Sequence, residues 1–266
     1  MKDIKLVITD MDGTLLNSKD EVSAVFFELY NALKQHNIKF VAASGRQHSS
    51  IISKLDAIKN DITIVSENGA LIREAETELL FTKFPIESIK KLIPVIRSIP
   101  NTHIILCGKD AAYIDSNDAH FNSVFTEYYR TYKKVEDLSK IEADDFMKIA
   151  IYHPDNSEKH IYPKLQHLEH EINVKVSGEH WVDLSVPNAN KGYALDFLQN
   201  KWNIKPEHTM AFGDFNNDLE MLKLAAFSYA MANAHPNVKA LSKFSTKSND
   251  DFGVESILKQ LIAAKS

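Results

Sequence analysis

Two aspartates stand at the end of a short apolar run near the start of the chain. Residues 4–9 are rich in β-branched side chains and too few for a helix, which predicts a buried strand of a parallel sheet. Asp10 and Asp12 follow it, and Gly13 permits a tight turn. In open α/β sheets, ligands bind at the carboxyl ends of the strands. Because two close carboxylates repel each other, a divalent metal is the simplest way to hold both in one site.

Two other interpretations of this stretch are a plain turn and a calcium-binding loop. Asp and Gly favour turns by themselves, so the turn stays open on this stretch alone. An EF-hand loop that starts at Asp10 needs an oxygen ligand at its fifth position and glycine at its sixth. The chain has Thr14 and Leu15 there, so the calcium interpretation fails on spacing.

Four stretches, in order along the chain, resemble the motifs of the haloacid dehalogenase superfamily of phosphotransferases. They are Asp-Met-Asp-Gly-Thr-Leu-Leu at 10–16, Ala-Ala-Ser-Gly-Arg at 42–46, Asn-Lys-Gly at 190–192 and Gly-Asp-Phe-Asn-Asn-Asp at 213–218. The stretch Ser-Glu-Asn-Gly-Ala at 66–70 and the long gap between Ser44 and Lys191 narrow the resemblance to the Cof-like, class IIB sugar-phosphatase branch. Each motif alone is weak, but four in order are specific.

The resemblance implies a nucleophile, an acid–base and a metal site. Asp10 is expected to attack phosphorus and to form an aspartyl-phosphate that water then hydrolyses. Asp12 is expected to protonate the leaving alcohol and then to deprotonate water. A Mg²⁺ ion would be held by an Asp10 oxygen, the Asp12 backbone carbonyl and Asp214, which are the hard oxygen ligands that this ion favours.

The resemblance also implies which residues bind the phosphate group of the substrate. These are Ser44, the backbone N–H of Gly45, Lys191 and Asn217, while Asp218 would orient Lys191 or a metal-bound water from behind. A serine or aspartate where a strand meets a helix is often only a helix N-cap, and this alternative stays open for Ser44 and Asp218.

The order of predicted elements divides the chain in two. Strands at 38–43 and 62–66, with helices between them, continue the first strand as a βαβαβ unit of a doubly wound, Rossmann-like α/β fold. The pattern changes at residue 84, and alternating apolar and polar residues near 174–186 predict an antiparallel sheet with one solvated face. We therefore expect a core of residues 1–83 and 187–266 with a mixed α/β cap domain, residues 84–186, inserted into it.

Several finer expectations follow from local patterns. The capping-box motif at 18–21 predicts the start of the first helix. One helix is expected through Ile161 to Ile172, and another from Asn190 to Trp202 with Tyr193 among its packed residues. His180 and Trp181 precede the strand that returns to the core. Two roles stay open for these side chains, which are contact with the substrate and plain aromatic packing between cap and core.

Composition excludes other classes of partner. The chain has 266 residues, 44% of them apolar, which is enough for a large core. Its net charge of −5 shows no basic excess for nucleic acid, and no apolar run approaches the roughly 20 residues of a membrane helix. The single Cys107 is expected in the core, as in a reducing cytoplasm. We expect a cytoplasmic protein that acts on a small phosphorylated metabolite, with no prediction of its oligomeric state.

The function predicted from these motifs is Mg²⁺-dependent hydrolysis of phosphomonoesters, and of sugar phosphates in particular, with substrate choice set by the cap. A phosphomutase on the same core is an alternative, although the large cap favours a phosphatase. A phospho-acceptor signalling domain also uses an aspartate, an acidic pair and a lysine, but would leave the inserted segment unexplained. A binding module without catalysis would have little need for Asp10, Asp12, Lys191 and Asp214 together.

Overall fold

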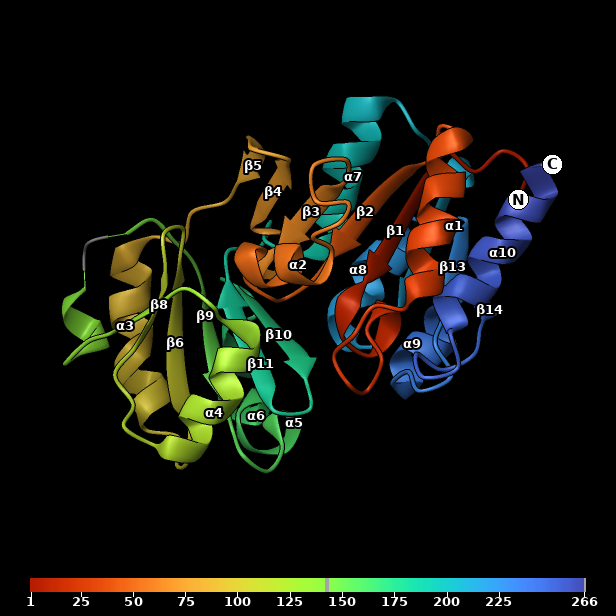
Figure 1. Cartoon of the computed structure of the whole chain (residues 1–266). Helices are drawn as coiled ribbons and strands as arrows, with labels where there is room; N and C mark the ends of the chain where they lie inside the picture. The colour runs from red at the N-terminus through yellow and green to blue at the C-terminus, as the bar shows by residue number, and fades with distance from the viewer. Residues whose placement is uncertain (142–143, 266) are drawn as a thin grey trace.

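The computed structural model describes residues 1–141 and 144–265, and within them the chain forms two sheets (Figure 1). An eight-stranded sheet takes its strands from both ends of the chain, and a six-stranded sheet takes its strands from the middle. The N- and C-termini lie near each other on the side of the larger part that faces away from the smaller one (Figure 1). The predicted fold class, a doubly wound α/β core with an inserted mixed α/β segment, is confirmed. Below, "core" means the larger part and "cap" means residues 84–186.

The core sheet has the strand order β14-β13-β12-β1-β2-β3-β4-β5. Its strands are β1 (Leu6–Asp10), β2 (Lys39–Ala43), β3 (Thr63–Ser66), β4 (Leu71–Glu74), β5 (Thr77–Phe81), β12 (Thr209–Gly213), β13 (Phe227–Ala230) and β14 (Phe244–Ser245). Strands β14 to β3 in this order are parallel, whereas β4 and β5 are antiparallel. The chain leaves β1 toward β2 and returns at β12 on the other side, so β1 and β12 form the switch point at which such sheets bind ligands.

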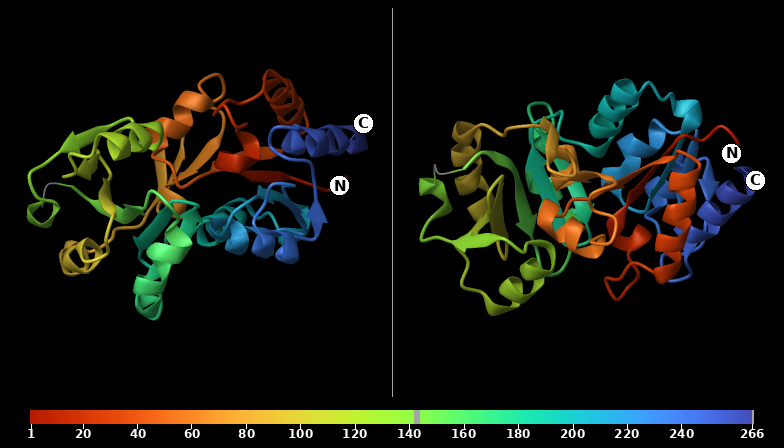
Figure 2. Two further views of the ribbon diagram at one scale, coloured as in Figure 1. Left: turned by 90° about the horizontal axis from the view of Figure 1, so that it is seen from below. Right: turned by 45° about the horizontal axis from the view of Figure 1, so that its top comes forward.

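Helices cover both faces of the core sheet (Figure 2). They are α1 (Ala24–Gln35), α2 (His48–Lys54), α7 (Lys191–Trp202), α8 (Leu219–Lys223), α9 (Pro236–Leu241) and α10 (Gly253–Lys265). Helices α1 and α10 contact each other on one face, and α7 and α8 contact each other on the opposite face. Because both faces are covered, all five residues of β1 are buried, as a near-continuous apolar strand of a parallel sheet requires.

The cap sheet has the strand order β10-β11-β9-β6-β7-β8. Its strands are β6 (His103–Gly108), β7 (Ala112–Ile114), β8 (Tyr132–Lys134), β9 (Phe146–Tyr152), β10 (Asn173–Gly178) and β11 (Trp181–Ser185), and its helices are α3 (Ile86–Arg97), α4 (Ala119–Tyr128), α5 (Ser157–His160) and α6 (Tyr162–Leu165). Neighbouring strands are antiparallel except for the parallel pair β7 and β8.

The expectation of one solvated face is only partly right for this sheet. Alternate residues of β10 are buried, as expected. Every residue of β9 is buried, however, because apolar side chains of α3 pack on one face of β6 and β9 and those of α4 pack on the other. The central cap strands therefore have two covered faces.

Two predicted helix positions are wrong. Helix α1 begins at Ala24, and its N-cap is Ser23, whose Oγ accepts a hydrogen bond from the Phe26 N–H at 3.1 Å. Residues 18–21 form a turn instead, in which Asn17 Oδ1 accepts hydrogen bonds from two backbone N–H groups. The helix expected before Ile172 is broken into α5, α6 and a short 3₁₀ turn, with Pro163 in the first turn of α6.

The structure differs from the sequence-based expectations in two smaller respects. Tyr193, expected in the core, is 39% exposed. The hairpin of β4 and β5 extends the core sheet beyond the predicted parallel half. No helix in the described part of the chain has both the length and the apolar content needed to cross a membrane.

Candidate active site

The turn after β1 brings two of the predicted carboxylates together. Asp10 ends β1, and Gly13 has a φ of +69°, a conformation that side chains with a Cβ rarely adopt. A Cβ at this position would also collide with Asp214 Oδ2, so glycine lets the carboxylate that follows β12 approach the turn. Thr14 Oγ1 donates a hydrogen bond to Asp214 Oδ1 at 3.3 Å. Asp10 and Asp214 thus face each other across the switch point.

Lys191 is a buried lysine that pairs with Asp10. It is the first residue of α7, and its side chain is fully buried. Its ammonium donates to Asp10 Oδ1 and, at 2.6 Å, to Asp218 Oδ1. Asp218 Oδ2 accepts the backbone N–H groups of Asp214 and Phe215 at 2.9 and 3.2 Å. The side chain of Asp218 makes no N-terminal cap on α8, but it takes part, through the Phe215 N–H, in a capping box on the 3₁₀ turn at 216–218. The same side chain therefore both caps this turn and pairs with Lys191.

The buried charges of this cluster do not balance. Carboxylate oxygens of Asp10, Asp214 and Asp218 lie within 4.8 Å of one another, and among the described residues Lys191 is the one cation that pairs with them. With all three ionised, two negative charges are left uncompensated. Burial and the nearby Asp218 raise the pKa of Asp10 to about 7, although Lys191 lowers it. Burial and Asp10 raise the pKa of Asp214 well above its usual value.

This charge and donor set fit a divalent cation. Carboxylate oxygens are ligands that Mg²⁺ accepts, and a bound dication would offset the two uncompensated charges. Asp218 is already engaged by Lys191 and by two backbone N–H groups. Asp10 and Asp214 each accept a hydrogen bond on Oδ1, from Lys191 and Thr14, and among the described residues no hydrogen bond reaches their Oδ2 atoms, which could take a metal. The carboxylate of Asp12 is not part of this group.

Asp12 points to a different partner, Arg46. Arg46 Nη2 lies 2.6 Å from Asp12 Oδ1, and Nε lies 3.0 Å from both carboxylate oxygens. Ser44 Oγ donates to Asp12 Oδ2 at 3.4 Å. Arg46 also bonds Asp20 Oδ1 at 2.7 Å and lies over the ring of Tyr128 in the cap. The sequence motif contains Arg46, but we assigned it no role from the sequence.

The predicted phosphate-binding residues lie at neighbouring strand ends. Ser44 Oγ accepts the Arg46 N–H at 3.0 Å, and α2 begins only at His48, so Ser44 is not its N-cap. Asn217 Nδ2 donates to Asn68 Oδ1 at 3.0 Å. Gly45 and Asn217 both line the cavity described next.

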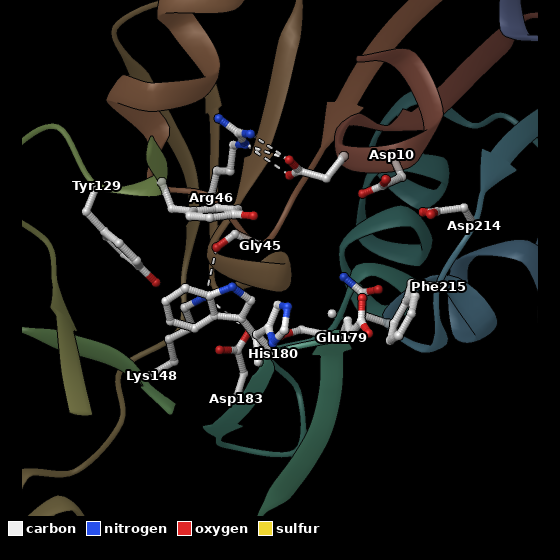
Figure 3. A pocket seen from close by; sticks show the side chains of 17 residues that line it. Asp10, Gly45, Arg46, Tyr129, Lys148, Glu179, His180, Asp183, Asp214 and Phe215 are labelled. Atoms are coloured by element: carbon white, nitrogen blue, oxygen red, sulfur yellow. Dashed lines mark hydrogen bonds and ion pairs between the residues drawn. The ribbon is translucent and has the colours of Figure 1, made fainter. Parts of the chain in front are cut away.

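A cavity of about 370 Å³ lies between these strand ends and the cap (Figure 3). Its core side includes Asp10, Asp12, Gly45, Arg46, Asp214 and Asn217. Its cap side includes Tyr128, Tyr129, Lys148, Glu179, His180, Trp181 and Asp183. In Figure 3, Asp10 and Asp214 lie on one side of the space, and Lys148 and Asp183 lie across it. His180 and Trp181, for which two interpretations were open, thus face the cavity.

Most cap residues of the cavity were missed from the sequence. Lys148 and Asp183 are single charges within strands that are otherwise largely apolar, β9 and β11. A charged side chain inside a buried strand needs a partner of opposite charge. The charges at these two positions therefore indicated, from the sequence alone, that Lys148 and Asp183 have a special role. Tyr128, Tyr129 and Glu179 gave no comparable signal, because only the packing of the cap on the core brings them to the cavity.

Comparisons with known proteins agree with this geometry. The family model described as haloacid dehalogenase-like hydrolase matches residues 7–258. The chain belongs to this family. It is 32% identical to the 5-amino-6-(5-phospho-D-ribitylamino)uracil phosphatase YbjI of Escherichia coli, over 97% of this chain and 96% of that protein. It is 30% identical to the phosphatase YwpJ of Bacillus subtilis, over 97% and 100%.

Solved structures share the fold of this chain. SMU.1108c from Streptococcus mutans UA159 has 31% sequence identity and a TM-score of 0.92, and the match covers 98% of this chain and 99% of that one. TM0651 from Thermotoga maritima has 28% identity and a TM-score of 0.79, with 97% of each chain covered. The resemblance seen in the sequence motifs is confirmed. This haloacid dehalogenase-like hydrolase is an enzyme, a phosphatase.

Proposed function

We propose that this phosphatase hydrolyses small phosphomonoesters in a Mg²⁺-dependent reaction through an aspartyl-phosphate on Asp10. The observation that carries the proposal is the arrangement at the switch point. Asp10 faces the cavity, Lys191 holds one of its oxygens, and Asp214 stands beside it as a second ligand for a cation. Bound Mg²⁺ would offset the charge of the carboxylates and of the phosphate group.

Charge compensation is what this site must provide. A phosphate dianion that approaches a carboxylate to about 4 Å meets a repulsion of roughly 4 kcal/mol for each pair of unit charges, at an effective dielectric of about 20. Lys191 supplies a fixed positive charge next to Asp10. The Gly45 N–H, after the end of β2, would donate to a phosphoryl oxygen, and Asn217 would add an amide from the loop after β12. The Ser44 hydroxyl would join them only by turning its hydrogen from Asp12 to the phosphate.

The reaction then has two steps on one phosphorus atom. An Asp10 oxygen forms a bond to phosphorus as the bond to the leaving oxygen breaks, and that oxygen takes a proton from Asp12. For this step Asp12 must be protonated, so one of its oxygens must give up the bonds that it accepts from Arg46 and Ser44 in this structure. Water next attacks the aspartyl-phosphate, Asp12 takes a proton from it, and the Asp10 carboxylate leaves. Arg46 and Ser44 hold the Asp12 carboxylate at the cavity wall in a fixed orientation.

The cavity beyond the carboxylates suits a polar metabolite. Its volume is in the range of small-ligand sites, and aromatic rings of the cap stand beside the carboxylate of Glu179. Rings can cover the face of a sugar or a heterocycle, and a carboxylate accepts hydrogen bonds from hydroxyl or amine groups. We propose phosphorylated sugars and related polyol phosphates as substrates, with the cap as the specificity domain. A reducing, cytoplasmic location is part of this proposal, since Cys107 is buried and unpaired.

A phosphate-release screen tests the proposal. The protein is incubated with a panel of phosphorylated sugars, polyols and nucleotides, with Mg²⁺ and with EDTA, and inorganic phosphate is measured. Asp10→Asn is the control for contaminating phosphatases. Release of phosphate from sugar or polyol phosphates by wild type alone supports the proposal. Transfer of the phosphoryl group between positions of a sugar, without release of phosphate, would make the enzyme a phosphomutase instead.

A further inference from the structure

Lys148 is a buried lysine that reaches from the cap to the core. It lies in the middle of β9 and is 2% exposed. Its Nζ donates to the backbone carbonyl of Gly45 at 2.7 Å, and it lies 3.1 Å from Asp183 Oδ2 and 3.1 Å from Glu67 Oε2. The contacts with Gly45 and Asp183 are hydrogen bonds, whereas the buried Glu67 carboxylate accepts no hydrogen bond from a described residue and pairs with Lys148 by charge alone. Lys148 also lines the cavity, so its bonds to Gly45 and Asp183 fix its ammonium at the cavity wall.

The contacts of Lys148 continue through the cap to a second loop of the core. Asp183 Oδ2 also accepts a hydrogen bond from Asn68 Nδ2, and Asn68 Oδ1 accepts one from Asn217 Nδ2 at 3.0 Å. All of these side chains are buried. Gly45 follows β2 and Asn217 follows β12, on opposite sides of β1. Within the core, the N–H groups of Glu67 and Asn68 already donate to the carbonyls of Arg46 and Ser44, at 3.1 and 3.0 Å. Lys148 and Asp183 add a connection from the cap to the same two loops, to which the proposed function assigns phosphate binding.

Simple adhesion between cap and core does not require this arrangement. Burial of a lysine and two carboxylates carries a desolvation cost that apolar side chains of the same size would avoid. Burial lowers the pKa of Lys148, but Asp183 and Glu67 outweigh it and raise that pKa. Another ion pair also links the cap to the core. Lys175 of β10 pairs with Glu220 of α8 at 2.6 Å, and neither residue lines the cavity.

We propose that Lys148 is a positioning residue: with the cap closed, it fixes the Gly45 loop relative to Asn217 at the spacing that a phosphate group needs. The proposal rests on the proposed function, which makes Gly45 and Asn217 phosphate ligands. It gives the cap a part in the chemistry as well as in substrate choice. Cap closure and assembly of the phosphate site are then one event.

The test compares Lys148→Met with the matched control Lys175→Met, each of which removes one cap lysine that pairs with the core. The kcat/KM is measured for p-nitrophenyl phosphate and for the best metabolite from the screen, and orthovanadate is the probe of the phosphate site. Lys148→Met should lower kcat/KM for both substrates by a similar factor, about 10- to 100-fold, and should weaken vanadate inhibition at least 10-fold. Lys175→Met should change neither vanadate inhibition nor p-nitrophenyl phosphate turnover by more than about 3-fold.

Circular dichroism and thermal melting establish that each variant is folded. If Lys148→Met does not fold, Asp183→Asn, which keeps the shape of the side chain and removes its charge, is measured in the same way. Unchanged vanadate inhibition in the folded variant, with a loss limited to the KM of the larger substrate, would overturn the positioning role. If wild type hydrolyses none of the compounds, the proposed function fails, and stabilisation by vanadate in thermal melting becomes the readout. The positioning role then stands only if Lys148→Met or Asp183→Asn weakens that stabilisation.

Discussion

Arg46 binds the carboxylate of Asp12 with two of its nitrogens, Nη2 at 2.6 Å from Oδ1 and Nε at 3.0 Å from both oxygens. The guanidinium is 4% exposed, and it also donates to the backbone carbonyl of Glu127 in the cap at 3.1 Å. A planar guanidinium that makes several directed bonds fixes the plane of the carboxylate as well as its position. The orientation of the proposed acid–base is therefore set by core and cap together.

Arg46→Lys should impair the step that needs a proton. Lysine keeps the charge but cannot make the paired contacts, so Asp12 loses its fixed orientation. The kcat/KM for an alkyl phosphate should fall about 10- to 100-fold. The loss should be smaller with p-nitrophenyl phosphate, whose leaving group departs without a proton. Arg97→Lys is the control, because Arg97 also pairs with two carboxylates, Asp115 and Asp137, which do not line the cavity. Equal losses on both substrates would contradict this role of Asp12.

Removal of the metal should abolish activity. Asp10, Asp214 and Asp218 crowd negative charge around one lysine, and a dication compensates it. EDTA is expected to silence the enzyme, and Mg²⁺ should restore it. Ca²⁺ should restore it poorly, because it takes more ligands at longer distances. Asp214→Asn should raise the Mg²⁺ concentration needed for half-maximal activity. Full activity in EDTA would contradict the assigned metal site.

The sequence predicts those site residues whose position depends on where a strand or helix begins or ends. Asp10, Ser44 and Asp214 each stand next to a strand end, and parallel strands bring their carboxyl ends to one edge of the sheet. Lys191 instead begins α7. The capping box at 18–21 was misleading because Asn17 competes for the same backbone N–H groups and makes a turn.

The cap side of the cavity could not be predicted in the same way. Tyr128 ends α4 and Trp181 begins β11, more than 50 residues apart in the printed sequence, and the packing of the cap itself brings them together. The position of the cap on the core then makes both part of the cavity wall. Their rings are in contact, with centroids 5.4 Å apart. Contacts of this kind depend on tertiary packing, for which neither periodicity nor a short motif gives a signal.

Trp181→Ala should change substrate preference more than it changes the chemistry. Trp181 forms part of the cap side of the cavity, where we expect the part of the substrate beyond the phosphate to lie. We expect kcat/KM for the best metabolite to fall by about 10- to 200-fold, the range for loss of a pocket contact, with little change for p-nitrophenyl phosphate. Tyr132→Ala, at a cap aromatic that is 45% exposed and outside the cavity, is the control. An unchanged preference ratio in Trp181→Ala would exclude the ring from substrate recognition.

His48 should make the fold sensitive to acid. Burial and the positive charge of Arg73 lower its pKa from 6.5 to about 4. Below pH 6.5 the unfolded chain therefore binds a proton that the folded chain does not, so the free energy of unfolding decreases as the pH falls from 6.5 toward 4. Urea titrations across this range should show a smaller decrease for His48→Gln than for wild type. His170→Gln, at an exposed histidine, should behave like wild type. If the free energy of unfolding of His48→Gln decreases with falling pH as steeply as that of wild type, other groups cause the acid sensitivity.

The most direct test of the account is to trap the covalent intermediate. In the part of the chain that the structure describes, Asp10 is the one carboxylate that both faces the cavity and is held by Lys191. Enzyme, Mg²⁺ and a turned-over substrate are mixed, quenched in acid within a single turnover and digested, and the peptides are analysed by mass spectrometry. The account predicts a phosphoryl group on Asp10 in wild type, none in Asp10→Asn, and a loss of several powers of ten in kcat for that variant. A wild-type enzyme that turns over without a phosphorylated Asp10 peptide, or an Asp10→Asn variant that keeps a tenth of the wild-type kcat, would contradict it.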